Sequence, residues 1–221
     1  MKRLFDLSHA IENGMITYKG LPAPIICDFL SREDSKKNYT DGTTFQIGKI
    51  EMVSNTGTYI DCPFHRYENG KDLNDVELER FVNIPAVVVK THRDLEHIEI
   101  GPEAFVKHDV KGKAVLVNTG WSRHWGTDQY FENHPFITKE GAEYLKEKGA
   151  KLVGIDSHNI DDTRTKNSRP VHSILLAAEI LIVEHMCNLD SLPDADLLFT
   201  AVPPRFRGVG TFPVRAFASE G

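Results

Sequence analysis

Several polar side chains that could do chemistry lie close together in the segment 55–65. In an extended chain they would project to one side, because side chains along such a chain repeat with period two. The glycine and the proline of the segment argue against a regular central strand and favour a loop whose backbone approaches a ligand. The alternative is a turn in which Asp61 caps backbone amides and His65 is an ordinary surface histidine. The polar residues concerned are Asn55, Tyr59, Asp61 and His65.

A second pair of candidate residues, His172 and Glu184, lies 12 positions apart. One continuous helix would leave them about 120° apart at 100° per residue, so a single helix does not align them. If His172 lies on a helix and Glu184 ends the apolar strand that follows, the two can converge. A carboxylate after so apolar a run is costly to bury alone, and a metal ion or another cation would neutralise it. The alternative for Glu184 is an exit into solvent.

A third polar cluster, DSHNID at 156–161, follows an apolar stretch that reads as a strand. The carboxyl end of a strand is a frequent place for ligand contacts in α/β folds. Asp156, Ser157 and Asp161 are equally suited to capping loop backbone. The sequence leaves open whether His158 reaches a site or points to water.

The elements that must position these groups are short β-branched runs with helical patterns between them. The most distinct helix is expected at 138–148, with Thr138 as its cap and Gly149 after its end. Further helices are expected at 171–179 and, more weakly, at 101–106. Because strands and helices alternate only in the second half, we expect a mixed sheet with flanking helices in a single domain, 1–221. Buried or half-buried strands are expected at 45–53, 86–90, 114–118, 152–155, 180–183 and 197–201.

Composition narrows the partners of the chain. Among 221 residues, 32 are acidic and 26 basic, and no basic run suggests a polyanion-binding surface, so nucleic acid is not an expected partner. The most apolar stretch, 174–183, is far shorter than the roughly 20 residues of a membrane span. Asp6 interrupts the only N-terminal apolar stretch that could form a signal-peptide core. Three widely spaced cysteines without a CxxC pair indicate reduced thiols, and a cytoplasmic location is expected.

Taken together, these segments resemble the cyclase family of metal-dependent hydrolases, which includes kynurenine formamidase and isatin hydrolase. The resemblance covers nearly the whole chain, and its ordered blocks are more specific than any one of them. It implies an α/β fold with a central mixed, barrel-like sheet and flanking helices. The blocks are DLSH at 6–9, GM at 14–15, YKG at 18–20, TGTYIDCPFH at 56–65, NTGW at 118–121, HP at 134–135, GIDSHNID at 154–161, VHSILL at 171–176, the segment 184–193 and PVR at 213–215.

The central motif of that family, H-T-G-T-H-x-D-x-P-x-H, is only partly present. The resemblance makes Asp61 a metal ligand and His65 the acid/base, while Asn55 and Tyr59 replace the two metal-binding histidines. The downstream metal ligands of the family match His172 and Glu184. Asp61 and Glu184 neutralise one divalent cation, and His172 adds a neutral ligand. We therefore expect about one divalent metal, Zn or Mn, per chain, since an amide and a phenol bind a second ion weakly.

The function implied by the resemblance is hydrolysis of a small amide, formamide or lactam, as in an arylformamidase acting on non-peptide C–N bonds. Water activated by the metal would attack the carbonyl, and His65 would move protons near its ordinary pKa of roughly 6.5. Tyr18, Phe64 and Trp121 are candidates for the substrate wall. The resemblance also implies a homodimer or homotetramer. Two rivals stay open: a catalytically silent relative that binds a small ligand, and a lactone hydrolase or dehydratase with Tyr59 as a proton donor.

Overall fold

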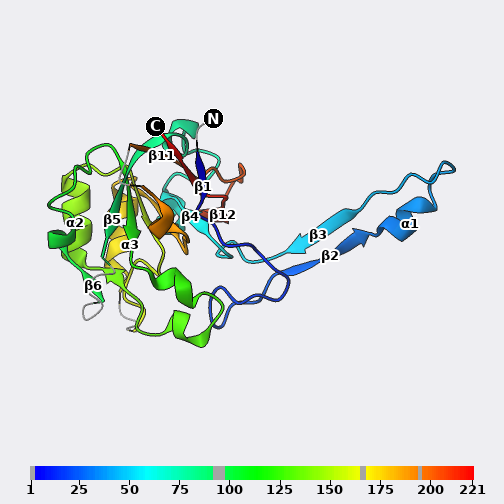
Figure 1. Cartoon of the computed structure of the whole chain (residues 1–221), viewed down its shortest axis with the longest axis horizontal. Helices are drawn as coiled ribbons and strands as arrows, with labels where there is room; N and C mark the ends of the chain where they lie inside the picture. The colour runs from blue at the N-terminus through cyan, green and yellow to red at the C-terminus, as the bar shows by residue number, and fades with distance from the viewer. Residues whose placement is uncertain (1–2, 92–97, 165–167, 194–195) are drawn as a thin grey trace.

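A strongly curved sheet of nine strands forms the centre of the molecule (Figure 1). The computed structural model describes residues 3–91, 98–164, 168–193 and 196–221. The strand order is β1-β13-β11-β5-β7-β9-β10-β4-β12. Strands β5, β7, β9 and β10 run parallel to one another, and the remaining neighbours pair antiparallel. The expected mixed, barrel-like α/β sheet is therefore confirmed.

Most of the expected strands form, and the structure adds several that the sequence pattern did not indicate. The added ones are short or lie at edges, where few residues carry the pattern. The strands are β1 (Leu4–Asp6), β2 (Ile25–Leu30), β3 (Ile47–Glu51), β4 (Tyr59–Asp61), β5 (Ile84–Lys90), β6 (Glu99–Ile100), β7 (Ala114–Asn118), β8 (Phe136–Ile137), β9 (Leu152–Ile155), β10 (Leu181–Glu184), β11 (Leu197–Thr200), β12 (Thr211–Pro213) and β13 (Phe217–Glu220).

Two helices, α2 (Lys139–Glu147) and α3 (Pro170–Ala177), cover one face of the sheet (Figure 1). Thr138 caps α2 by accepting a hydrogen bond from the amide of Gly141, as expected. Gly149, just after the helix, has a φ of 77°, a value that glycine adopts without strain. The weak third helix is not present: the expected segment contains only a 3₁₀ turn, Pro102–Ala104. Among the described residues no helix has the length and apolarity to cross a membrane.

Side chains on the two faces of the central strands belong to two separate apolar clusters. Val115, Val117 and Val153 pack with residues of α2 and α3, whereas Leu116 and Leu152 belong to the cluster on the opposite face. This division follows from the alternation of side chains along a strand. Strands buried on both faces give the continuous apolar runs seen in the sequence. The central sheet is thus a rigid frame for the polar residues at its edges.

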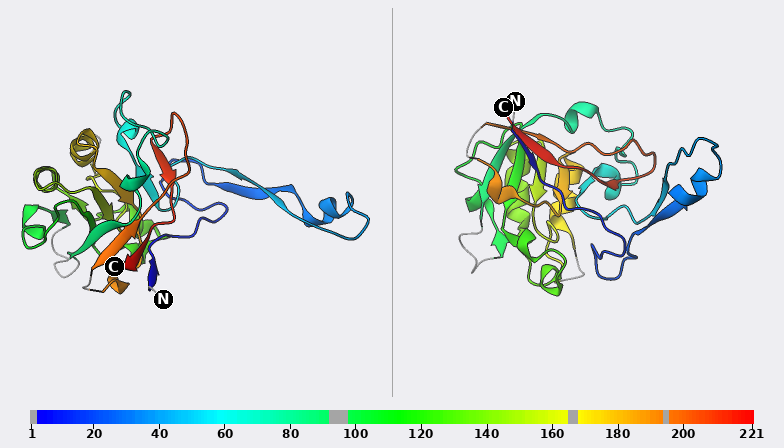
Figure 2. Two further views of the ribbon diagram at one scale, coloured as in Figure 1. Left: turned by 90° about the horizontal axis from the view of Figure 1, so that it is seen from above. Right: turned by 45° about the vertical axis from the view of Figure 1, so that its right-hand side comes forward.

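One expectation about burial is wrong. The segment 45–53 was expected to be a buried or half-buried strand, but every residue of β3 within it is exposed. β3 pairs only with β2, and the short helix α1 (Arg32–Lys36) lies between them in sequence. This hairpin projects away from the body (Figures 1 and 2). Among the described residues its strands form no sheet pairing with the body, and nearly all of their side chains are exposed.

Candidate metal centre and active site

Strand register brings the main polar groups to one face of the sheet near its edge. β4 pairs with β10, so that Tyr59 lies opposite Glu184, and with β12, so that Asp61 lies opposite Thr211. Residues directly opposite each other in an antiparallel pair point to the same face, as do residues two apart on one strand. All four side chains therefore share one face. This satisfies the expectation that Glu184 turns inward rather than into solvent.

Asp61 is fully buried, and only one of its carboxylate oxygens has a hydrogen-bond partner. Its Oδ1 accepts from the hydroxyl of Thr211, whereas its Oδ2 has no hydrogen-bond partner among the described residues. A buried carboxylate oxygen without a partner is costly. Nε2 of His172 lies 3.8 Å from Oδ2. The arrangement therefore leaves one anionic oxygen available to a cation.

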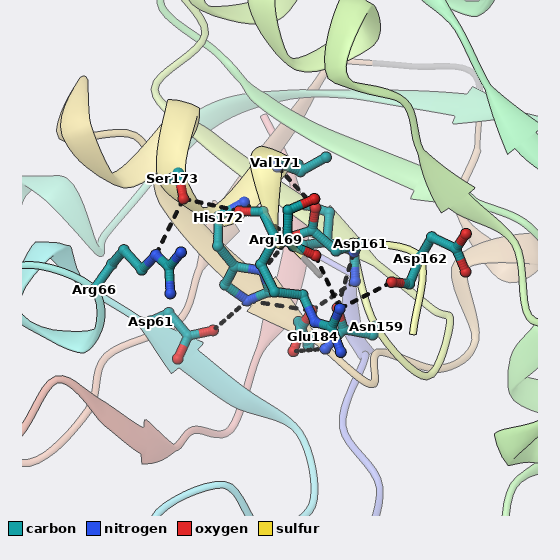
Figure 3. Close-up of polar contacts among 12 residues, drawn as sticks. Asp61, Arg66, Asn159, Asp161, Asp162, Arg169, Val171, His172, Ser173 and Glu184 are labelled. Carbon is teal, nitrogen blue, oxygen red and sulfur yellow. Dashed lines mark hydrogen bonds and ion pairs between the residues drawn. The ribbon is translucent and has the colours of Figure 1, made fainter. Parts of the chain in front are cut away.

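His172 is held rigidly by Asp161 at the start of α3. Oδ2 of Asp161 lies 2.6 Å from Nδ1 of His172, and the same carboxylate accepts from the backbone amides of Val171 and His172. Asp161 therefore caps the helix and orients the ring. With the proton on Nδ1, the lone pair is on Nε2, which faces Asp61 and lies 3.7 Å from Oε1 of Glu184 (Figure 3). A carboxylate behind a metal-binding histidine is a usual supporting arrangement.

The charge balance around His172 favours a positive charge at this point. Burial alone would lower the pKa of His172, but Glu184, Asp161 and Asp61 outweigh burial and raise it to about 10. Three carboxylates thus surround one imidazole. A proton on His172 satisfies them, and so does a divalent cation held between His172 and Asp61. A proton and a metal ion therefore compete for His172, as they do for histidine metal ligands in general.

Glu184 accepts hydrogen bonds on both oxygens. The hydroxyl of Tyr59 donates to Oε2 at 2.5 Å, and the amide of Ile160 donates to Oε1 at 2.6 Å. Burial raises the pKa of Glu184 to about 7, although His172 opposes the shift. Burial and the nearby Glu184 raise the pKa of Tyr59 well above its usual value. Tyr59 therefore stays a neutral phenol and a hydrogen-bond donor, which makes it a poor metal ligand.

His65 lies at the more open side of the site, in the 3₁₀ turn Pro63–His65. Its Nδ1 is 2.7 Å from the hydroxyl of Thr211, which also contacts Asp61. Because Thr211 donates to Asp61, it accepts from Nδ1 of His65, and neutral His65 then carries its basic lone pair on Nε2. Gly210 packs so closely against the backbone of His65 that no Cβ fits there. His65 is about one-third exposed, as a group that exchanges protons with a ligand requires.

Several of these groups line a cavity of about 310 Å³, although Asp61 is not among its lining residues. Tyr18, Tyr59, His65, His172 and Glu184 all reach this cavity, as the sequence analysis expected. Phe64 and Trp121, two of the three expected wall residues, do not line it, because Phe64 packs against the apolar core and Trp121 is buried with its Nε1 donating to the carbonyl of Tyr130. The complete lining is Tyr18, Leu21, Asn55, Tyr59, His65, Arg66, Asn159, Arg169, His172 and Glu184.

The structure also brings in residues to which sequence reasoning gave no role in the chemistry. Asp161 was considered only as a loop cap, and its second function, the hydrogen bond to His172, depends on the position of α3. Thr211 lies 150 positions from Asp61, and no local pattern marks it. Asn159 donates to the hydroxyl of Tyr18. The polar cluster 156–161 was the available signal for Asn159 and Asp161, whereas Thr211 had none.

The donor atoms suit a divalent cation. Asp61, His65 and His172 each offer one ligand atom, and these three atoms lie within 4.8 Å of one another. The expected set of Asp61, His172 and Glu184 shares two of these residues. Carboxylate oxygen and imidazole nitrogen are ordinary ligands for zinc and manganese. The two sets differ only in whether His65 or Glu184 is the third ligand.

Comparison with known proteins places the chain in a family. The model of the family described as Putative cyclase matches residues 5–162. The chain belongs to the cyclase family. The kynurenine formamidase of Bacillus anthracis is 28% identical over 214 residues, covering 96% of this chain and 94% of the relative. The kynurenine formamidase of Bacillus cytotoxicus is 29% identical over 212 residues with the same coverage.

Solved structures show the same cyclase-family fold. Isatin hydrolase A from Labrenzia aggregata superposes with a TM-score of 0.84 at 21% identity, covering 99% of this chain and 94% of that one. A predicted metal-dependent hydrolase from Bacillus stearothermophilus superposes with a TM-score of 0.80 at 23% identity, and 100% of both chains is covered. The resemblance seen in the sequence motifs is thus confirmed at the level of family and fold.

Proposed function

We propose that this chain is a metal-dependent hydrolase of small amides, formamides or lactams, with about one Zn or Mn ion per chain. The observation that carries the proposal is the pairing of His172 with Asp61. Asp161 holds Nδ1 of His172, and Nε2 faces the buried Asp61 oxygen that lacks a partner. The family relatives named kynurenine formamidase and isatin hydrolase support the same reaction class.

Asp61 and His172 would hold the ion, with Glu184 as the expected third ligand. A bound divalent ion would lower the pKa of a water molecule and polarise a carbonyl oxygen. The carboxylates of Asp61 and Glu184 balance its charge, and Asp161 keeps Nε2 of His172 directed at it. The described residues thus provide both the ligands and the support behind them.

His65 would act as the acid/base of the reaction. Its neutral form carries a lone pair on Nε2, which can take a proton from water and return it to the leaving nitrogen. Thr211 fixes the ring from Nδ1 and links it to Asp61. Because the side chain is about one-third exposed and lines the cavity, it can reach a bound substrate.

The lining of the cavity favours a small substrate with a negative or strongly polar group. Arg66, Arg169, Asn55 and Asn159 are among the lining residues. Arg66 donates from Nε to Ser173, and Arg169 donates from Nη1 to the carbonyl of Asp162. Guanidinium groups bind carboxylates through paired hydrogen bonds. A cavity of about 310 Å³ fits a single aromatic or bicyclic ligand rather than a polymer.

Metal analysis together with a substrate screen tests the proposal. We expect protein purified without chelator to carry about one divalent ion, and to hydrolyse an N-formyl aromatic amide or a fused lactam faster with the metal than after chelation. Restoring activity with Zn or Mn identifies the ion. A protein that binds no divalent ion contradicts the proposal. A protein that binds metal but acts only on lactones moves the reaction to the redirected chemistry in which Tyr59 donates a proton.

The cellular location is also a proposal. The three cysteines are all free in the structure, Cys27 exposed and Cys62 and Cys187 buried. Free thiols persist in reducing compartments. We therefore infer a cytoplasmic location, and fractionation of the native host tests it.

A further inference from the structure

A second cavity, of about 650 Å³, lies at the carboxyl ends of the parallel strands. Three residues that line it are Asn118, the last residue of β7, Asp156, which follows β9, and Cys187, shortly after β10. Ligands of α/β sheets commonly bind outside the carboxyl ends of parallel strands. The cavity is about twice the size of the candidate active-site cavity and shares no lining residue with it.

The second cavity and the candidate metal centre use opposite faces of the sheet. Side chains alternate along a strand, so Asn118 shares the face of Leu116, whose apolar cluster lies away from α2 and α3. By the same alternation Glu184 shares the face of Ile182, which packs in the cluster of α2 and α3. A ligand held by Asn118 therefore does not occupy the candidate metal centre.

Asn118 brings a buried donor to the second cavity. The side chain is only 1% exposed, and its Oδ1 accepts from the amide of Gly120, which fixes the orientation of the amide group. Its Nδ2 has no hydrogen-bond partner among the described residues, and neither has the buried Nε2 of His9. Burial lowers the pKa of His9 to about 4, so this ring is neutral. A buried amide donor without a partner is costly, and a ligand oxygen would satisfy it.

Asp156 places a negative charge beside this donor. The hydroxyl and the backbone amide of Thr119 donate to its Oδ1, and the amide of Gly120 donates to its Oδ2. These donors are neutral, so they hold the carboxylate in place without cancelling its charge. Burial raises the pKa of Asp156 to about 6, which leaves the group ionised at neutral pH and above.

The rim of the cavity does not reverse this charge. Asp190 adds a second carboxylate and Arg123 one guanidinium group, and both side chains are exposed. Burial raises the pKa of the Cys187 thiol to about 11, and the negative charges of Asp6, Asp156 and Asp190 add to the shift. The surroundings of Cys187 are therefore negative, which favours a cationic ligand over an anionic one.

We propose that the second cavity binds a small primary amine that also carries a hydroxyl or carbonyl oxygen. The oxygen would accept from Nδ2 of Asn118, and the ammonium group would lie toward the carboxylates of Asp156 and Asp190. A cavity of about 650 Å³ has room for a ligand of one or two rings. This inference goes beyond the proposed function, because it concerns a separate cavity and stands whether or not the chain is a hydrolase.

Other ligands fit the second cavity less well. Within the part of the chain that the structure describes, the residues grouped closely enough to hold a metal ion are Asp61, His65 and His172, which lie elsewhere. A small anion would meet the carboxylates of Asp156 and Asp190. A purely apolar molecule would leave Nδ2 of Asn118 without a partner.

Calorimetry on the full chain with three related compounds tests the ligand chemistry. Phenylalaninol has both the amine and the hydroxyl and contains no amide bond that the proposed hydrolase could cleave, and we expect it to bind with a Kd of about 1 mM or tighter. 2-Phenylethylamine lacks the oxygen and should bind about 3- to 10-fold more weakly, since one hydrogen bond is lost. 3-Phenylpropionate has the opposite charge and should bind more weakly still. No binding of phenylalaninol at millimolar concentration, or equal binding of the propionate, overturns the proposal.

Four charge variants at exposed positions test the location of the ligand. Asp190→Asn should weaken the binding of phenylalaninol by about 2- to 5-fold, and Arg123→Gln should strengthen it by a similar factor, because the two changes alter the charge of the rim in opposite directions. Glu140→Gln on α2 and Arg66→Gln at the candidate active-site cavity are the matched controls, and both should leave the Kd unchanged. Unchanged affinity in both rim variants, or a change in Arg66→Gln alone, contradicts binding in the second cavity.

Discussion

The candidate active site and the hairpin of residues 25–51, here called the arm, are opposite kinds of structure within one chain. Asp61, His172 and Glu184 come from β4, α3 and β10, and every one of them is buried. The contact between Asp61 and His172 joins segments more than 100 residues apart. The arm, in contrast, is exposed along its strands, and these strands pair only with each other. The site is therefore held by contacts from several parts of the chain, whereas the strands of the arm are held mainly by their own pairing.

This difference separates what mutations should do. A change at the site removes one partner of a buried, mutually supporting group, so a large local effect is expected. A change to an exposed side chain of the arm removes no buried group and should leave metal binding and turnover unchanged. An arm variant that lost metal or activity would show that the two regions are coupled.

The largest effect is expected for His172→Ala. The variant removes the nitrogen ligand that faces Asp61 and Glu184, so metal content should fall from about one ion per chain to nearly none. Elemental analysis of the purified protein measures this. Two variants serve as controls: His108→Ala, at a partly exposed position outside the cavity, and Ile26→Lys, Ile50→Lys on the arm. Both should keep the metal, and unchanged metal content in His172→Ala would disprove the ligand assignment.

Next in size is the effect of His65→Asn on turnover. Loss of an acid/base should lower kcat by about 10²-fold or more on any accepted substrate, while metal content stays nearly constant. Steady-state kinetics and elemental analysis on the same preparation separate the two. Because His65 also lies in the group of three residues that could hold an ion, loss of the metal would show instead that it is a ligand.

Asp161→Asn should have an intermediate effect. Asp161 is a positioning residue, and loss of such a carboxylate behind a metal-binding histidine typically weakens metal affinity by about 10–100-fold. Because the amide nitrogen of Asn cannot accept, the variant should also lose a backbone hydrogen bond at the start of α3, about 0.5–1.5 kcal/mol of stability. Titration with a competing chelator measures the affinity. A loss of stability with unchanged metal affinity would show that Asp161 caps α3 but does not support metal binding.

The same contrast explains what could be predicted from sequence. Their polar or turn-forming context marked Asp61, His65, His172 and Glu184 as candidates but left a capping or surface role open, and the resemblance to the family motif is what assigned them roles. The central strands were accessible from their β-branched runs. Thr211 was not, because its contact with Asp61 depends on the register of β12, which no local pattern records. The error at β3 has another cause: apolar residues in a segment favour a strand, but they do not show that the strand lies in the central sheet, and β3 pairs only with β2 and is exposed.

A smaller effect, on the pH dependence of stability, tests the buried surroundings of the site. Burial lowers the pKa of His158 to about 3, so between pH 6.5 and 3 the unfolded chain binds a proton that the folded chain does not. This difference in proton binding lowers the free energy of unfolding as the pH falls, by about 1.4 kcal/mol per pH unit. His158→Gln removes it. Urea unfolding of both proteins at several pH values, with chelator present, should show a shallower loss in the variant, and parallel curves would contradict it.

The smallest expected change concerns the two substitutions in the family motif. Asn55 and Tyr59 stand where the family motif has histidines, and both line the cavity. The variant Asn55→His, Tyr59→His adds two nitrogen donors and removes the phenol that donates to Glu184, so metal content should rise from about one toward two per chain.

The activity of the same variant then shows whether the site has only lost metal ligands or whether Tyr59 has gained a role in the reaction. If only ligands were lost, formamide hydrolysis should increase together with metal content. If Tyr59 now serves as a proton donor, the variant should bind more metal and lose the activity of the native protein. The variant Tyr59→Phe is the matched control, because it removes the hydroxyl without adding a ligand, and it should lower activity only in the second case. A correctly folded double-histidine variant that still binds one ion would show that the surrounding side chains, rather than the missing ligands, exclude the second metal.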